Sequence, residues 1–91
     1  MQKYFLDIYN DISETINTIC QNAIYEKYNC YCELNTITEY SDYDNKTAFF
    51  IVFYDVNRYT TIELHLYVNF DNDNYFDNSR VEYISMKSDK N

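Results

Sequence analysis

The sequence contains no glycine and no proline. Phosphate-binding loops need glycine, because its missing side chain lets backbone N–H groups approach the ligand closely. Its absence excludes a nucleotide site of that kind, and it weakens the case for any enzyme because active-site loops frequently use glycine. The turns must instead be built from Asn and Asp, whose side chains bond to the neighbouring backbone.

Residues that bind metals are also scarce, with three cysteines and one histidine in the chain. Cys20, Cys30 and Cys32 lack the spacing of a disulfide framework. A Cys30–Cys32 bridge would join two residues on one face of an extended strand, which is poor geometry. We therefore expect reduced thiols. A closed zinc site needs about four ligands, so we expect no metal and no cofactor.

His65, the single histidine, lies on the polar side of an alternating segment. One interpretation is a general base, and the other is a solvated or interface histidine. We favour the second, since no Ser or Cys can be placed beside it. Catalytic carboxylate pairs need one apolar and one polar environment, whereas the acids here fall in turns or on polar faces. We expect no catalytic residue and a protein that is not an enzyme.

Long apolar runs are missing too. The longest nearly apolar stretch covers residues 48–54, far fewer than the ~20 residues that a membrane-spanning helix needs. Asp7 and Asp11 interrupt the region where a secretion signal would need a continuous apolar segment. We therefore expect a cytoplasmic protein without a membrane partner.

Lysine is scarce while acids are abundant. Fifteen acidic residues face seven basic ones, which gives a formal net charge of -8. The residue usage indicates an AT-rich genome, but that bias would also produce many lysines, and the chain has only five. Codon usage alone therefore explains the acidity poorly. Such a charge disfavours direct binding to nucleic acid or to an anionic membrane and favours a basic partner, which is often a nucleic-acid-binding protein.

An amphipathic helix is the clearest periodic signal present. Apolar residues recur every three or four positions, as on one face of a helix, and they are Phe5, Ile8, Ile12, Ile16, Ile19 and Ala23. Ile24 widens this stripe. The pattern predicts a helix over about residues 3–27, and Asn29 is a suitable stop because Asn tolerates the left-handed conformation at a helix end.

The rest of the chain is typical of strands joined by polar turns. We predict strands at residues 30–40, 47–56, 60–70 and 79–87, and turns or loops at 41–46, 57–58 and 71–78. The first strand alternates around Cys32, Leu34, Thr36, Thr38 and Tyr40, and the third around Ile62, Leu64, Leu66, Val68 and Phe70. Consecutive strands with short loops favour a meander. We predict an α+β fold, with one N-terminal helix on a four-stranded antiparallel meander sheet (α-β-β-β-β) and a single domain over residues 1–91.

The second strand is apolar on both faces. Phe49, Ile51 and Phe53 alternate with Phe50, Val52 and Tyr54. Because one helix covers only one face of the sheet, one of these triplets should lie uncovered, near Tyr67. Exposed apolar patches usually mark a contact surface, and Tyr is enriched in interface cores. The alternative is strong curvature that lets loops or chain ends cover the patch.

An acidic segment after the third strand invites comparison with a calcium loop. Asp71, Asp73, Asp77 and Glu82 occupy ligand positions of the EF-hand pattern. Phe76 stands where that pattern needs glycine for a sharp turn, and the flanks are typical of strands rather than helices. We therefore favour a solvated acidic turn.

The acids form three sets. They are Asp7, Asp11 and Glu14 on the predicted helix, Glu39, Asp42 and Asp44 in the first hairpin, and Asp71, Asp73 and Asp77 in the last loop. Carboxylates on a small rigid scaffold can imitate the phosphates of a nucleic acid and occupy a basic groove. The alternative is that they keep a small domain soluble. With Tyr67, these residues are our candidates for partner binding.

Small size, strong acidity, a lone helix on a sheet and the lack of a catalytic set together resemble small phage-encoded inhibitors of host defence, including some anti-CRISPR proteins. The resemblance implies a stoichiometric inhibitor in the host cytoplasm that blocks the DNA or RNA site of a CRISPR effector. A second hypothesis is a structural or assembly subunit that pairs copies, such as a homodimer, through the uncovered sheet face.

Overall fold

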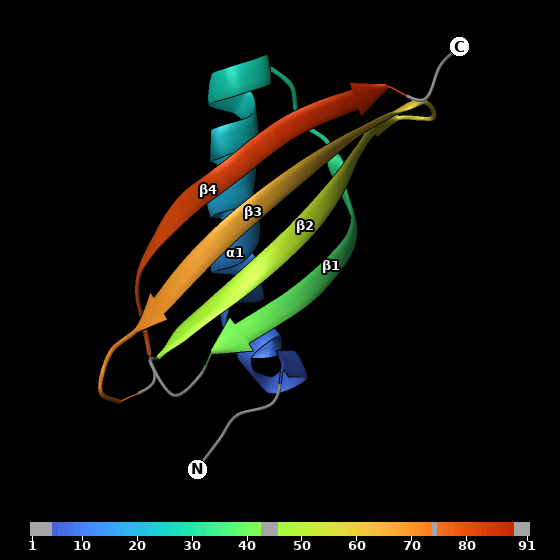
Figure 1. Cartoon of the computed structure of the whole chain (residues 1–91). Helices are drawn as coiled ribbons and strands as arrows, with labels where there is room; N and C mark the ends of the chain where they lie inside the picture. The colour runs from blue at the N-terminus through green and yellow to red at the C-terminus, as the bar shows by residue number, and fades with distance from the viewer. Residues whose placement is uncertain (1–4, 43–45, 74, 89–91) are drawn as a thin grey trace.

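The computed structural model describes the backbone of residues 5–42, 46–73 and 75–88, with side chains described at 13–35, 46–73 and 75–88. One helix, α1 (Phe5–Tyr28), precedes four strands: β1 (Glu33–Asp42), β2 (Thr47–Asn57), β3 (Thr60–Phe70) and β4 (Phe76–Ser88). The strands form one antiparallel sheet in the order β1-β2-β3-β4. The helix crosses behind this sheet (Figure 1). The predicted α+β meander with an N-terminal helix is confirmed.

The helix presents its apolar stripe to the sheet, as predicted. Ile16 and Ile24 are fully buried, and Ile19 and Ala23 pack against the core. Cys20 is also fully buried although the predicted stripe omitted it, since a free Cys behaves as a small apolar residue. The side chains of Phe5, Ile8 and Ile12 lie outside the described residues.

The helix ends at the predicted stop. Asn29 has a φ of 56°, and its N–H donates to the carbonyl of Tyr25 at 2.8 Å. Asn adopts this left-handed conformation more readily than most residues, which is why it can replace glycine after a helix. Lys27 in the last turn donates to the carbonyl of Ile84 at 3.1 Å and so ties this end of the helix to β4.

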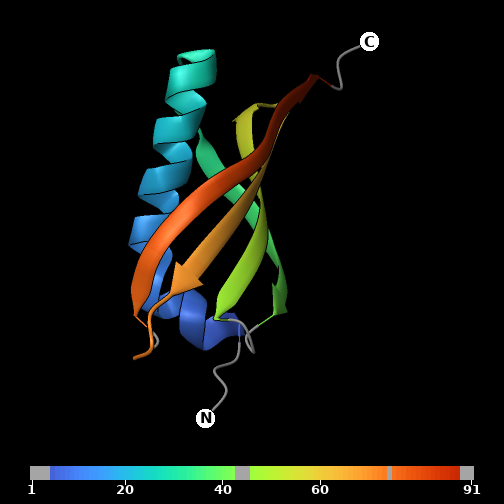
Figure 2. The same ribbon diagram turned by 60° about the vertical axis from the view of Figure 1, so that its left-hand side comes forward.

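The core lies between the helix and one face of the two central strands. Its fully buried strand residues are Ala48, Phe50, Val52, Tyr54, Ile62, Leu64, Leu66 and Val68. The side-chain alternation predicted for β3 is confirmed, because intervening residues are only partly buried. Phe70, at the end of that series, packs against the edge of the core. The sheet curves around the helix (Figure 2), which wraps this face over the apolar stripe.

Two predicted boundaries near β1 are wrong. The strand begins at Glu33 rather than residue 30 and continues to Asp42, into the predicted turn. A register shift at Asn35 leaves Leu34 paired with Tyr54 and Thr36 paired with Phe53. Positions 34 and 36 therefore lie on opposite faces of the sheet, because a bulge inserts one unpaired residue. Simple alternation in the sequence cannot reveal that insertion.

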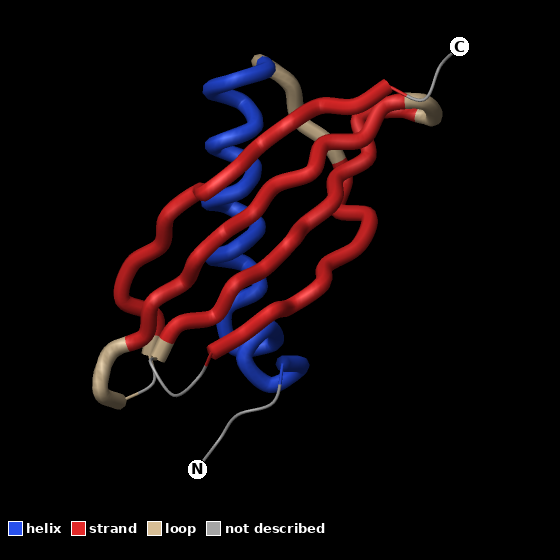
Figure 3. Tube along the Cα trace, in the orientation of Figure 1, coloured by secondary structure: helices blue, strands red, loops and turns tan. Residues whose placement is uncertain are grey.

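The predicted loop at 71–78 is too long. β4 begins at Phe76, so that Asp77 lies in a strand. Phe76 packs against the core, and Asn78 pairs with Asn69 across the two strands. The polar sequence around Asp77 hid this extension, which is visible in the long final strand of the Cα trace (Figure 3).

Candidate binding surface

The uncovered face of the sheet carries a cluster of rings, here named the aromatic face. It consists of Phe49, Ile51, Phe53, His65, Tyr67 and Tyr83, contributed by β2, β3 and β4. The register pairs Phe49 with Tyr67, Ile51 with His65, and His65 with Tyr83. Directly paired residues share one face of a sheet, so the three strands present one continuous patch. Of the two apolar triplets of β2, the uncovered one is therefore Phe49, Ile51 and Phe53.

Ring contacts link these strands side by side. Phe49 stacks on Tyr67 with centroids 4.6 Å apart, and its edge-to-face contact with His65 spans 5.6 Å. His65 lies 4.6 Å from the ring of Tyr83 in β4. Most of these residues are half-buried by their neighbours, but Tyr83 remains 47% exposed. The patch is thus ordered by contacts within the sheet and still open to a partner.

His65 belongs to this patch. Its Nε2 lies 2.5 Å from Glu63 Oε2, and its side chain is only 21% exposed. The carboxylate orients the imidazole ring between Phe49 and Tyr83. Of the two interpretations of His65, this packing favours a histidine within a contact surface, because carboxylate and rings occupy its surroundings.

Arg80 and Glu82 complete the β4 side of the patch. The Arg80 guanidinium lies over the Tyr67 ring, 4.8 Å from its centroid. Its Nη1 donates to Glu82 Oε2 at 2.7 Å. Tyr67, a predicted partner-binding residue, is therefore stacked on one side by Phe49 and approached by a cation. Sequence reasoning missed Arg80 and considered Glu82 only as part of a calcium pattern, because the bulge between His65 and Leu66 sets their position.

The acidic sets gather at one end of the molecule, here named the acidic end. The start of α1, the end of β1 and the end of β3 lie together at that end in both views (Figures 1 and 2). Its backbone positions include Asp7, Asp11, Asp42, Asp71, Asp73 and Asp77. Asp44 lies outside the described residues, as do the side chains of Asp7, Asp11, Glu39 and Asp42.

The acids of the first-hairpin set do not all lie on one face of the sheet. Asp42 pairs with Thr47, in the rows of the uncovered face, whereas Glu39 pairs with the buried Phe50. These two acids therefore occupy rows of opposite faces, because the side-chain direction reverses at every residue of a strand. Glu14 is exposed in the middle of the helix. The acidic end is therefore formed by aspartates, whereas Glu14 and Glu39 lie apart from it.

A row of polar side chains supports the acidic end. Thr47 Oγ1 donates to Asn69 Oδ1 at 2.9 Å, and Asn69 Nδ2 donates to Asn78 Oδ1 at 2.8 Å. Asn78 Nδ2 in turn donates to Asp77 Oδ2 at 3.3 Å. This chain of bonds crosses β2, β3 and β4, and so it holds Asp77 on a rigid edge next to the aromatic face.

The loop after β3 is organised by its own first acid. Asp71 Oδ1 accepts hydrogen bonds from the N–H groups of Asp73 at 2.9 Å and Tyr75 at 3.0 Å. This is the side-chain turn that Asp is expected to supply when glycine is absent. Within residues 5–73 and 75–88, excluding 43–45, no group of three His, Cys, Asp or Glu residues could hold a metal ion.

The opposite end of the molecule has a different charge balance. Lys27 ends the helix, Arg58 lies in the β2–β3 turn, and Lys87 lies near the end of β4. Asp55 is exposed close to this turn and accepts a hydrogen bond from Asn35 at 3.1 Å. These three bases are matched by Glu26, Glu33 and Asp55, whereas the acidic end sets Lys46, which lies beside the end of β3, against a larger number of aspartates.

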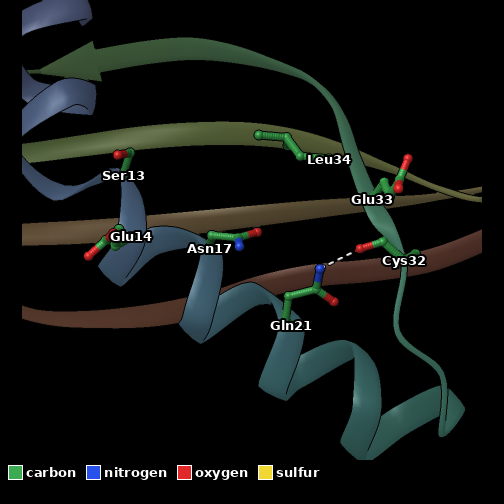
Figure 4. A pocket seen from close by; sticks show the side chains of 7 residues that line it. All are labelled: Ser13, Glu14, Asn17, Gln21, Cys32, Glu33 and Leu34. Carbon is green, nitrogen blue, oxygen red and sulfur yellow. Dashed lines mark hydrogen bonds between the residues drawn. The ribbon is translucent and has the colours of Figure 1, made fainter.

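A groove of about 380 Å³ separates the helix from the start of β1 (Figure 4). Its lining residues are Ser13, Glu14, Asn17, Gln21, Cys32, Glu33 and Leu34. The Gln21 amide N–H donates to the Cys32 carbonyl across this groove, and Asn17 Oδ1 accepts a bond from the buried Tyr54 hydroxyl at 3.0 Å. The groove walls are therefore joined by polar contacts, and Glu14 lies on the helix side of the sheet.

All three cysteines are free thiols. Burial raises the pKa of Cys20 to about 12, although a hydrogen bond with Tyr54 acts in the opposite direction. Burial, Cys30 and Asp55 raise the pKa of Cys32 to about 11. The thiols of Cys20 and Cys32 are therefore protonated at neutral pH, and reactive cysteines are thiolates. Their chemistry therefore resembles that of structural cysteines.

Over the part of the chain that the structure describes, no helix is long and apolar enough to cross a membrane. Comparisons of the chain with protein-family models, curated proteins and solved structures found no match. Function is therefore inferred from the geometry and charge of the surface itself.

Proposed function

We propose that the protein is a non-catalytic binding protein that presents its acidic end to a basic partner and occupies that partner's nucleic-acid site. The observation that carries this proposal is the gathering of aspartates from the helix, the first hairpin and the third strand at one end. These positions are far apart in the sequence, so their common location is a property of the fold.

The geometry suits charge-driven docking. Asp73 and Asp77 are exposed, and the bonds that Asp71 and Asp77 accept come from within the protein's own turn and strand edge. Fixed carboxylates can be spaced like phosphates, and a charge of -8 accelerates encounter with a basic surface. A CRISPR effector, with its basic guide and target channel, is a partner of this chemistry, and the protein would act in the host cytoplasm.

The test uses two variants of equal charge. One replaces Asp71, Asp73 and Asp77 with Asn, which keeps an acceptor oxygen for the turn. The control replaces Glu26 and Glu33 with Gln and Asp55 with Asn, three acids away from the acidic end. The protein is used to capture a nucleic-acid-binding partner, and the captured partner is then titrated with its DNA or RNA.

We expect the protein to compete with nucleic acid, and we expect competition to weaken steeply with salt, because exposed charges are screened. The Asp-to-Asn variant should lose about tenfold or more in affinity, and the control variant much less. Equal losses in both variants would show that total charge, rather than the acidic end, drives binding. A captured partner that still binds its nucleic acid fully would contradict the proposal.

A second candidate is an assembly subunit in which copies pair through the aromatic face. The half-buried rings of Phe49 and Phe53 favour it, since apolar sheet faces are commonly covered in assemblies. Sedimentation at micromolar concentration decides the question. A tight homo-oligomer that dissociates in a Phe53→Asp variant would support this candidate, and a monomer at all concentrations would contradict it.

A further inference from the structure

The aromatic face combines exposed rings with carboxylates. Tyr83 is 47% exposed, and the side chains of Glu63 and Glu82 are 39% and 46% exposed. Glu63 and Tyr83 lie on neighbouring strands, one row apart, because Glu63 pairs with Ser85 and His65 pairs with Tyr83. Diagonal neighbours of this kind lie within reach of one long side chain.

The protein already places one guanidinium on this face. Arg80 lies over Tyr67 at 4.8 Å and donates to Glu82 at 2.7 Å. Ring and carboxylate thus act together on a single cation. Arg combines these two contacts better than Lys, since its planar group stacks on a ring while its N–H groups bond to a carboxylate.

The second ring and carboxylate of the face, Tyr83 and Glu63, both contact His65. Among the described residues, Lys or Arg side chains lie over the rings of Tyr28, Tyr59 and Tyr67, whereas the ring of Tyr83 packs beside that of His65. Glu63 bonds to His65 through Oε2, and its side chain stays 39% exposed. Tyr83 and Glu63 therefore repeat the ring and carboxylate of Tyr67 and Glu82, and their exposed parts can receive a guanidinium from outside the protein.

We propose that the aromatic face recognises an arginine side chain of a basic partner, with the guanidinium stacked on Tyr83 and bonded to Glu63. This inference rests on the proposed function, because it specifies arginine within the basic partner. The face is continuous with the acidic end: Asn69 and Asn78, which support Asp77, lie one row from Tyr67 and Arg80. An arginine-rich segment can contact both regions at once.

Charge favours this occupant over two others. A second copy would bring another net charge of -8 to the interface, and high net charge keeps proteins monomeric. Bases of a single-stranded nucleic acid also stack on aromatic faces, but their phosphates would meet the acidic end. A cationic segment gains from both the rings and the carboxylates.

The test compares an arginine peptide with a lysine peptide of equal length and charge, each labelled and titrated against the full chain by fluorescence anisotropy. Arg can stack on a ring and bond to a carboxylate at the same time, which Lys does less well, so we expect the arginine peptide to bind about fivefold more tightly, a difference of about 1 kcal/mol. Tyr83→Leu and Glu63→Gln should each bring this ratio close to one. Tyr59→Leu is the matched control, because Tyr59 is 46% exposed but lies in the β2–β3 turn, and it should leave the ratio unchanged.

The results separate this inference from the proposed function. Equal binding of both peptides overturns the arginine site and leaves the acidic end as a general cation surface. If the variant with Asn at Asp71, Asp73 and Asp77 binds both peptides more weakly but keeps the ratio of their affinities, the result supports both ideas. Failure of either peptide to bind contradicts both. A homodimer that Tyr83→Leu dissociates would show that a second copy covers this face, and it would overturn the inference.

Discussion

The two faces of the sheet differ although they are built from the same strands. On β2, Phe50, Val52 and Tyr54 are completely buried under the helix, whereas Phe49, Ile51 and Phe53 are only half-buried on the other side. The fully buried core between the covered face and the helix is mainly aliphatic, with Phe50 and Tyr54 as its rings. The uncovered face contains rings, carboxylates and a guanidinium. We propose that one face supplies stability and the other recognition, and neighbouring residues of one strand can be used to test that division.

The largest difference is expected between two adjacent phenylalanines. Phe50→Ala removes a fully buried ring and should lower the free energy of unfolding by about 3–5 kcal/mol. Phe49→Ala removes a half-buried ring and should cost about 1–2 kcal/mol. Urea unfolding followed by circular dichroism measures both values. Equal losses would mean that the uncovered face is part of the core, and the comparison would then be wrong.

The second prediction concerns the thiol at the centre of the covered face. The pKa of Cys20 rises from 9.0 in its unperturbed state to about 12 in the fold, so the folded protein holds the thiol proton more tightly. The stability that the protonated Cys20 thiol contributes to the fold is fully present below pH 9, and it is lost as pH rises toward 12. Stability of the parent protein should fall about 1.4 kcal/mol per pH unit more steeply than that of Cys20→Ala over this range.

The difference between those two slopes is the quantity to measure, because tyrosines also ionise at high pH and their effect is common to both proteins. Cys20→Ala will also be less stable at every pH through lost packing. Parallel slopes would indicate that Cys20 is accessible to water in the folded protein.

A third pair compares hydroxyl groups. Tyr54→Phe removes a buried hydroxyl that donates to Asn17 at 3.0 Å, and the expected loss is about 1 kcal/mol. Tyr67→Phe removes a hydroxyl from the uncovered face and should change stability by less than about 0.5 kcal/mol. Thermal unfolding of both variants is sufficient. A larger effect at Tyr67 would reveal that the uncovered face contributes hydrogen bonds to the fold.

The smallest effect is expected at the exposed ion pair. The side chains of Arg80 and Glu82 are 66% and 46% exposed, and such pairs contribute about 0–1 kcal/mol. Arg80→Gln should therefore leave the unfolding midpoint almost unchanged while it frees the ring of Tyr67. If it destabilises the protein strongly, the contact belongs to the scaffold rather than to a binding surface.

Sequence periodicity predicted most of this fold. The stripe at Ile16 and Ile24, the alternation of β3 and the stop at Asn29 each follow from side-chain spacing or from one residue's backbone preference. Errors arose where pairing between strands decides the structure. The bulge at Asn35 and the early start of β4 at Phe76 depend on neighbouring strands, and a single strand's sequence carries little information about its register.

The candidate surface was predictable only in its parts. The acids and Tyr67 could be named from the sequence, and one apolar triplet of β2 was expected to remain uncovered. The contact of Arg80 with Tyr67 joins β4 to β3 through a register set by another bulge. The meeting of the start of α1 with the ends of β1 and β3 depends on how the helix crosses the sheet (Figures 1 and 2). Both features need the three-dimensional arrangement, because their members are distant in sequence.

The meander topology also has a consequence for the order of folding. Every pair of adjacent strands is consecutive in the chain, so the sheet closes only short loops, whereas the helix must find strands far along the sequence. Short loops close with less loss of entropy, and we expect the hairpins to form before the helix docks. Cys20 becomes inaccessible only when that last step occurs. The rate at which this thiol becomes protected from a labelling reagent would therefore time the arrival of the helix.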